Sequence, residues 1–120
     1  MPNPTRHQPA ATPDELGRLF VERANAGDVD GLVALYEPEA VLAFPSGEFA
    51  AGHAEIRAVY ESLVADAPRF DPGTPQPAMI TGDLALTSTR LVGGGVTVEI
   101  AHRQPDGTWL WAVDQPNICD

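Results

Sequence analysis

Cysteine, basic side chains and long apolar runs are all scarce in this chain of 120 residues. The single cysteine, Cys119, lies beside the C-terminus and has no partner for an intramolecular disulfide, so no disulfide framework supports the fold. Only 7 lysines and arginines stand against 17 aspartates and glutamates, which gives a formal net charge of −10. Because so acidic a surface repels phosphate backbones, we expect no nucleic acid partner.

The sequence also lacks an apolar run of about 18 or more residues, the length that a membrane-spanning helix needs. Its N-terminus lacks the charged-then-apolar order of a signal peptide. We therefore expect a cytoplasmic protein with no membrane partner. The composition predicts a disordered, proline-rich arm over residues 1–11, one domain over residues 12–116 and a short tail over residues 117–120.

Helical signals occupy the first half of the chain. A capping-box sequence, Thr12-Pro13-Asp14-Glu15, precedes leucines at helical spacing and predicts a first helix over residues 13–26. Asp28 can cap a second, short helix whose apolar stripe includes Tyr36. The most regular helical pattern follows Gly52, where apolar residues recur at i, i+3, i+4, i+7 and i+8.

Extended segments dominate the second half. A short apolar run with a brief partner precedes the third helix, a loop rich in proline follows that helix, and three strands complete the chain. The predicted strands are 40–44, 49–51, 84–92, 96–103 and 108–114, with the loop at 70–77. Glycine-containing turns, Gly93-Gly94-Gly95 and Pro105-Asp106-Gly107, predict two hairpins. Helices followed by mainly antiparallel strands describe an α+β domain with three N-terminal helices on one face of a curved sheet.

Alternation divides each strand between two faces. In one long strand Thr97, Glu99, Ala101 and Arg103 share a face, and the residues between them share the other. In the closing strand, strict alternation sets Trp109, Trp111 and Val113 against Leu110, Ala112 and Asp114. The two tryptophans therefore either both face the helices or both face a partner subunit. The pattern alone leaves open which face of the sheet meets the helices.

Several short motifs, in their order and spacing, resemble the nuclear transport factor 2-like superfamily in its SnoaL-like and ketosteroid isomerase-like branches. They include Asn25-Ala26-Gly27-Asp28, Pro45-Ser46-Gly47, Gly52-His53-Ala54-Glu55-Ile56 and Asp106-Gly107-Thr108-Trp109. The resemblance covers about residues 13–116. It implies a cone-shaped sheet that, with the helices, encloses an apolar pocket, and a homodimer that pairs through the sheet. It implies a fold more firmly than an activity.

Ketosteroid isomerases use an aspartate base and an oxyanion hole made of a tyrosine and a protonated aspartic acid. The resemblance places these three groups at Phe44, Phe20 and Ala101. Neither phenylalanine nor alanine can move a proton or donate a hydrogen bond, so this machinery is not expected here. SnoaL-like cyclases rely on an aspartate from the late part of the sheet, and the resemblance makes Asp114 its nearest equivalent.

Asp114 is therefore the favoured catalytic acid–base group, with Glu99 and His53 as helpers. A carboxyl group in an apolar cavity has a raised pKa, because desolvation opposes its charged form, and can act as a base near neutral pH. Glu99 shares the cavity wall if the face of Ala101 points inward. The alternatives are that Asp114 caps the strand end or pairs with an N–H of the tail, and that His53 is a solvated residue at a helix entry. Glu99 has its own alternative, an ion pair with Arg90 or Arg103 across strands.

The predicted pocket lining combines aromatic side chains with two small residues from the late sheet. It consists of Phe20, Tyr36, Phe44, Tyr60, Thr97 and Ala101. The three histidines show no metal-binding spacing, so we expect no metal and no cofactor. The leading hypothesis is an isomerase, cyclase or dehydratase that transfers a proton on a small apolar molecule. The competing hypothesis is a non-catalytic ligand-binding or dimerisation module of the same fold.

Overall fold

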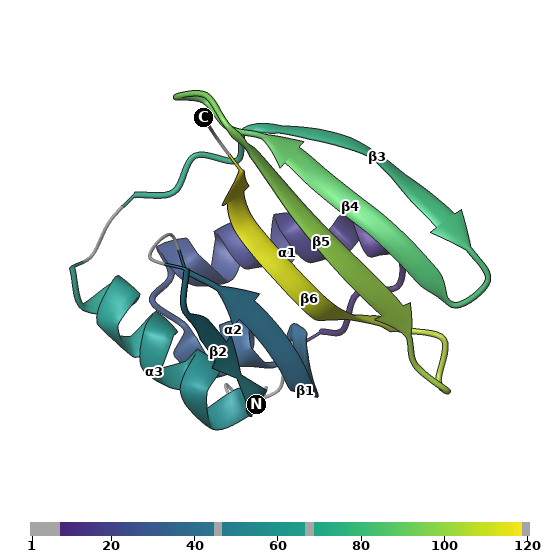
Figure 1. The fold of residues 1–120 in the computed structure, drawn as a ribbon, viewed down its shortest axis with the longest axis horizontal. Helices are drawn as coiled ribbons and strands as arrows, with labels where there is room; N and C mark the ends of the chain where they lie inside the picture. The colour runs from purple at the N-terminus through teal and green to yellow at the C-terminus, as the bar shows by residue number, and fades with distance from the viewer. Residues whose placement is uncertain (1–7, 45–46, 67–68, 119–120) are drawn as a thin grey trace, which may run out of the picture.

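A computed structural model describes the chain over residues 8–44, 47–66 and 69–118. Its elements are α1 (Pro13–Asn25), α2 (Val29–Val33), β1 (Tyr36–Ala43), β2 (Phe49–Ala51), α3 (Gly52–Ala65), β3 (Thr74–Thr81), β4 (Leu84–Arg90), β5 (Val96–Arg103) and β6 (Trp109–Ile118). The strands form one curved, open sheet in the order β2-β1-β6-β5-β4-β3 (Figure 1). All neighbouring pairs are antiparallel except β1 and β6. The α+β architecture predicted from the sequence is confirmed.

The helices cover the sheet in two groups. α1 runs behind β6, β5 and β4, whereas α2 and α3 pack against each other and α3 packs on β1 and β2 (Figure 1). The helices contribute the fully buried side chains of Leu16, Leu32 and Ile56. Leu35, which precedes β1, and Leu42 of β1 are fully buried as well. Within the described ranges, no helix is long and apolar enough to cross a membrane.

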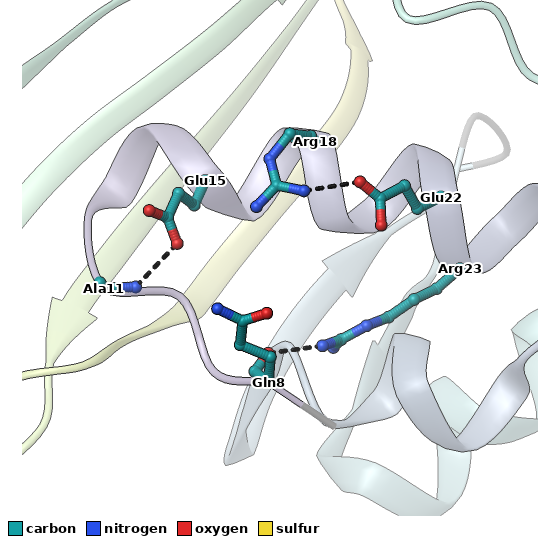
Figure 2. Close-up of polar contacts among 6 residues, drawn as sticks. All are labelled: Gln8, Ala11, Glu15, Arg18, Glu22 and Arg23. Atoms are coloured by element: carbon teal, nitrogen blue, oxygen red, sulfur yellow. Dashed lines mark hydrogen bonds and ion pairs between the residues drawn. The ribbon is translucent and has the colours of Figure 1, made fainter. Parts of the chain in front are cut away.

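The start of α1 follows the predicted capping sequence with one difference. Pro13 occupies the first turn, but Thr12 makes no side-chain hydrogen bond to the helix. Instead, the backbone N–H of Ala11 donates to the carboxylate of Glu15 at 3.1 Å (Figure 2). The reciprocal half of the capping box is therefore present, displaced by one residue, and the helix begins where the sequence indicated.

Residues 8–11, which belong to the predicted disordered arm, contact the domain. Ala10 is buried and its carbonyl accepts a hydrogen bond from the N–H of Trp109 at 3.0 Å. The guanidinium of Arg23, itself buried, donates to the carbonyl of Gln8 at 2.6 Å (Figure 2) and to that of Gly31 at 2.8 Å. These bonds attach the segment before α1 to the sheet and to Arg23 of α1, which also bonds to α2. Residues 1–7 of the predicted arm lie outside the described residues.

The second helix is shorter than its apolar pattern indicated. Asp28 caps α2 by accepting a hydrogen bond from the N–H of Gly31 at 3.0 Å, as predicted, but the helix ends at Val33. Tyr36, expected on this helix, is instead the first residue of β1 and pairs with Trp111 of β6. The ladder between β1 and β6 shifts register after Tyr36, and this irregularity accommodates Pro38 within the strand. Its place in β1 buries Tyr36 beneath the helices on the inner side of the sheet, where the residue is 1% exposed.

The loop predicted over residues 70–77 is shorter than expected, because β3 begins at Thr74. β3 lies at the edge of the sheet that the described residues form, so on its outer side no N–H of β3 is needed to pair with a neighbouring strand. Prolines are tolerated on such an edge, which explains why Pro75 and Pro77 lie in a strand.

The register between β5 and β6 shifts at two places, and the shift between Ile100 and Ala101 changes which residues of β6 face the helices. Ala101 of β5 pairs with Trp111, whereas the preceding residue of β5, Ile100, pairs with Val113. One extra residue therefore stands in β6 at Ala112, which makes a β-bulge. After the bulge the strand presents Asp114, together with the two tryptophans, to the helices and turns Val113 outward. The prediction that the tryptophans and Asp114 lie on opposite faces of the sheet is therefore wrong.

Candidate active site

Two carboxyl groups face each other on the inner side of the sheet. Glu99 of β5 pairs directly with Asp114 of β6. Glu99 is 6% exposed and Asp114 5% exposed, so both lie beneath the surface on the side that the helices cover. The face of β5 that carries Ala101 points inward, as the resemblance suggested. The β-bulge in β6 adds Asp114 to the same side, and the two acids thus become cross-strand neighbours.

Asp114 lies at the end of a chain of three side chains from three elements. The hydroxyl of Tyr36, on β1, donates a hydrogen bond to Oδ2 of Asp114. The hydroxyl of Tyr60, on α3, lies 2.5 Å from the hydroxyl of Tyr36. Among the residues that the structure describes, Oδ1 of Asp114 has no hydrogen-bond donor. Tyr36 therefore holds one oxygen of the carboxyl group in place, and the two oxygens have different surroundings.

Glu99 lies at the end of a second chain. The hydroxyl of Thr87, on β4, donates to Oε1 of Glu99 at 2.7 Å. The indole Nε1–H of Trp111 in turn donates to the hydroxyl of Thr87 at 3.2 Å. Thr87 was not predicted from the sequence to belong to the site. The available signal was its strand parity, because Thr87 shares a face with the apolar Ala85 and yet is polar.

Burial decides the protonation of this cluster. Burial raises the pKa of Asp114, the negative charge of Glu99 adds to the rise and the hydrogen bond from Tyr36 opposes it, and together they bring the pKa to about 7. Burial also raises the pKa of Glu99, against hydrogen bonds from Thr87 and Thr97 that favour its charged form. The pKa values of Tyr36 and Tyr60 are both raised by burial and by the charge of Asp114. Both tyrosines are therefore neutral hydroxyl groups, whereas Asp114 changes charge near neutral pH.

Aromatic rings cover the tyrosines. The ring of Phe20 lies 6.0 Å from that of Tyr60 and 6.2 Å from that of Trp111, between centroids. Phe20 also packs edge-on against the ring of Phe70, with 5.9 Å between the ring centroids. The side-chain amide of Asn25 holds the backbone of Phe70 by two hydrogen bonds, of 2.8 and 3.1 Å. The surroundings of the acids are therefore apolar and are supplied by α1, α3 and the segment that precedes β3.

The other predicted site residues lie in different surroundings. The ring Nε2–H of His53 donates to the backbone carbonyl of Tyr36 at 2.8 Å, so His53 reaches the acids only through β1. Phe44 lines a surface hollow of about 490 Å³ between β1, β2 and α3, and neither Asp114 nor Glu99 lines that hollow. Thr97 lies beside Glu99 and accepts a hydrogen bond from the N–H of Thr89.

The alternatives raised for the two carboxyl groups do not describe this site. Arg103, a proposed partner of Glu99, forms an ion pair with Asp83 at 2.6 Å. Arg90 pairs in register with Val96 and shares no hydrogen bond with Glu99 in the described part of the chain. Asp114 is bonded to a tyrosine hydroxyl and not to an N–H of the tail. Across residues 8–44, 47–66 and 69–118, no three His, Cys, Asp or Glu side chains form a group that could hold a metal ion.

Comparison with known proteins places this geometry in a family. Residues 18–119 match the family described as SnoaL-like domain. A ketosteroid isomerase-like protein from Erwinia carotovora atroseptica has a TM-score of 0.71 at 20% identity, over 88% of this chain and 93% of that one. A candidate dehydratase of the NTF2-like family from Streptomyces avermitilis has a TM-score of 0.64 at 18% identity, over 88% and 94%.

A third similar structure is described as a candidate calcium/calmodulin-dependent protein kinase type II association domain from Thiobacillus denitrificans. It has a TM-score of 0.72 at 17% identity, over 93% of this chain and 100% of that one. At these identities the likeness establishes the fold alone. No curated protein matches the chain.

Proposed function

Because the chain belongs to the SnoaL-like domain family, we propose that it is a cofactor-independent enzyme that moves a proton within a small apolar molecule, with Asp114 as its acid–base group. The observation that supports this most is a carboxyl group buried among aromatic side chains, whose pKa burial raises to about 7. A group with such a pKa exists in both forms near neutral pH. It can therefore accept a proton and return it within one turnover.

The hydrogen bonds of Asp114 assign a role to each of its oxygens. Tyr36 occupies Oδ2 and fixes the plane of the carboxyl group, so Oδ1 is the atom that takes a proton from a carbon or oxygen of the substrate. Return of that proton to a different atom of the same molecule gives an isomerisation. Return to a hydroxyl that leaves as water gives a dehydration. Such acid–base help contributes about 10²- to 10⁴-fold in rate.

The surroundings support an apolar substrate. The rings of Phe20, Phe70 and Tyr60 offer large flat surfaces, and no arginine or lysine of the described residues bonds to either carboxyl group. A charged substrate would lose its hydration in such a site without a compensating partner. Two of the similar structures are described as ketosteroid isomerase-like and as a candidate dehydratase, and both activities move protons on organic molecules.

A solvent-exchange assay tests this function without knowledge of the natural substrate. A panel of apolar ketones and alcohols is incubated with the protein in deuterium oxide, and incorporation of deuterium at carbon is followed by NMR. We expect wild-type protein to accelerate exchange in at least one compound and its Asp114→Asn variant to leave the buffer rate unchanged. Exchange that is equally fast in both proteins would remove Asp114 from the mechanism.

We also propose that two copies pair through the outer face of the sheet. The outward side chains of β4, β5 and β6, as far as Gln115, include no aspartate or glutamate, although the chain carries 17 of them. Most are apolar, and Leu84 and Val113 remain about half exposed. Among the described residues, the one carboxylate bonded to these strands' outward side chains is that of Glu37, on His102. Two copies with a net charge of −10 each repel one another, so this mostly apolar face is where they can approach with the least repulsion.

Val113→Asp is expected to convert the dimer to a monomer, because it places a negative charge in the apolar part of this face in each copy. Sedimentation equilibrium at micromolar concentration measures the change. Val92→Asp is the matched control, since Val92 is also exposed but lies in the turn between β4 and β5. The control should remain dimeric. A monomeric wild-type protein, or a Val113→Asp variant that still dimerises, would contradict the proposed interface.

A further inference from the structure

The two buried carboxyl groups differ in what holds them. Glu99 accepts from Thr87, and Thr87 accepts from the indole N–H of Trp111. An indole N–H can only donate, and a hydroxyl carries a single hydrogen. The hydroxyl hydrogen of Thr87 must therefore point to Glu99. This chain has one direction, and at its end Oε1 of Glu99 is always an acceptor.

The chain at Asp114 can run in either direction. It consists of two tyrosine hydroxyls, and each of these can both donate and accept. With Asp114 charged, Tyr60 donates to Tyr36 and Tyr36 donates to Asp114. With a proton on Oδ2, the carboxyl group donates to Tyr36, and Tyr36 donates to Tyr60; a proton taken up on Oδ1 leaves Oδ2 as the acceptor from Tyr36. Asp114 therefore keeps a satisfied hydrogen bond in both protonation states, whereas the bonds of Glu99 favour its charged form.

We propose that Glu99 is a positioning residue for Asp114. The hydrogen bonds from Trp111 through Thr87 keep Glu99 ionised, so that of the two acids it is Asp114 that holds a proton near neutral pH. The inference rests on the proposed function, because Asp114 is taken as the group that exchanges the proton. The titratable groups that face Asp114 are Glu99 from β5, Tyr36 from β1 and Tyr60 from α3. From α1, the ring of Phe20 packs against Tyr60 and carries no charge.

A fixed negative charge beside Asp114 has a direct chemical consequence. Like charges on adjacent strands oppose each other, so the charge of Glu99 disfavours loss of the proton from Asp114. This effect adds to that of burial. The two acids thus have different roles: Glu99 adds to burial in raising the pH at which Asp114 exchanges its proton, and Asp114 carries that proton to and from the substrate.

The experiment is a pH titration of the side-chain carboxyl carbons by ¹³C NMR, in wild type and in Glu99→Gln. In wild type we expect Glu99 to titrate at lower pH than Asp114. Glutamine keeps the shape of the residue and an oxygen acceptor for Thr87, but it removes the charge. The Asp114 midpoint is therefore expected to fall by about one pH unit or more in this variant. A residue with a merely structural role would leave that midpoint unchanged.

A second pair of variants tests the chain that holds Glu99. Thr87→Val removes the donor, so the midpoint of Glu99 should rise, and Thr87→Ser should restore it. An Asp114 midpoint that is the same in wild type and Glu99→Gln, or a Glu99 that titrates above Asp114, would overturn the proposal. These titrations need no substrate. If the titrations contradict the role of Glu99 while deuterium exchange still depends on Asp114, only the present inference is wrong. If the titrations agree with it but no deuterium exchange occurs, only the proposed function is contradicted.

Discussion

Replacement of Asp114 by asparagine is expected to abolish proton transfer and, at the same time, to stabilise the protein at pH 8. The loss follows because an amide cannot exchange a proton in this range, and the expected decrease in rate is about 10²- to 10⁴-fold. The gain follows because the ionised carboxylate is buried. A pKa raised to about 7 lies about 3 units above the ordinary value, and each unit corresponds to about 1.4 kcal/mol, so ionisation costs the folded state roughly 4 kcal/mol.

Chemical unfolding in urea at pH 8, combined with the deuterium-exchange rate, checks both parts of this result. Asp71→Asn is a matched control, since Asp71 is exposed in the segment before β3. This control should retain the exchange rate and change the free energy of unfolding by less than about 0.5 kcal/mol. An Asp114→Asn variant that is active, or that is less stable than wild type at pH 8, would mean that the buried carboxylate is a structural group.

The wild-type protein is expected to lose stability as the pH rises from about 4 to about 8. The pKa of Asp114 is about 7 in the folded protein and about 4 in an unfolded chain. Between these values the folded state holds a proton that the unfolded state has released. Stability therefore falls with rising pH in this window, by roughly 4 kcal/mol in total from Asp114. The raised pKa of Glu99 acts in the same direction.

Urea unfolding at pH 5 and at pH 8 measures this dependence, and the comparison with Asp114→Asn isolates its source. The whole chain is acidic, so general charge repulsion also grows with pH and contributes to both proteins. Only the part due to Asp114 should disappear in the variant. If the two proteins lose the same stability between pH 5 and pH 8, then Asp114 is already ionised at pH 5 in the folded state.

Local chemistry predicted a large part of the fold. The capping sequence at Thr12 set the start of α1, and β5 has the predicted bounds, because its alternation and its flanking turns are both strong signals. The same alternation put Glu99 and Ala101 on one face. Only long-range packing could decide that this face is the inner one, and there the resemblance pointed in the correct direction.

The features that assemble the site were harder to predict, because each depends on contacts between distant segments. The bulge at Ala112 has no glycine to mark it, and it is visible only as the register shift against β5. The hairpin between β4 and β5 closes at the hydrogen bond from Leu91 to Gly95. If both ends of this turn were moved one residue toward the C-terminus, Thr89 would stand opposite Glu99 in place of Thr87. The face of the strand on which Glu99 lies was therefore predictable from the sequence, whereas its hydrogen-bond partner Thr87 was not.

Tyr36 illustrates the same limit. Its spacing fits the apolar stripe of a short helix, and helical signals are local. Its actual place in β1 depends on parallel pairing with β6, a strand more than half the chain away in sequence. Only this tertiary pairing brings the Tyr36 hydroxyl to Asp114. The sequence drew attention to Tyr36 and Tyr60 but did not predict the hydrogen bonds that connect them to Asp114.

Whether Asp114 can act as the acid–base group depends on the pH midpoint of its carboxyl carbon in the wild-type protein, measured by ¹³C NMR and assigned by its absence in Asp114→Asn. We expect a midpoint near 7, because the group is buried and lies beside a second carboxylate. A midpoint near 4, the ordinary value for an aspartate, would contradict it, because Asp114 would then be a fully ionised group at neutral pH with no proton to exchange.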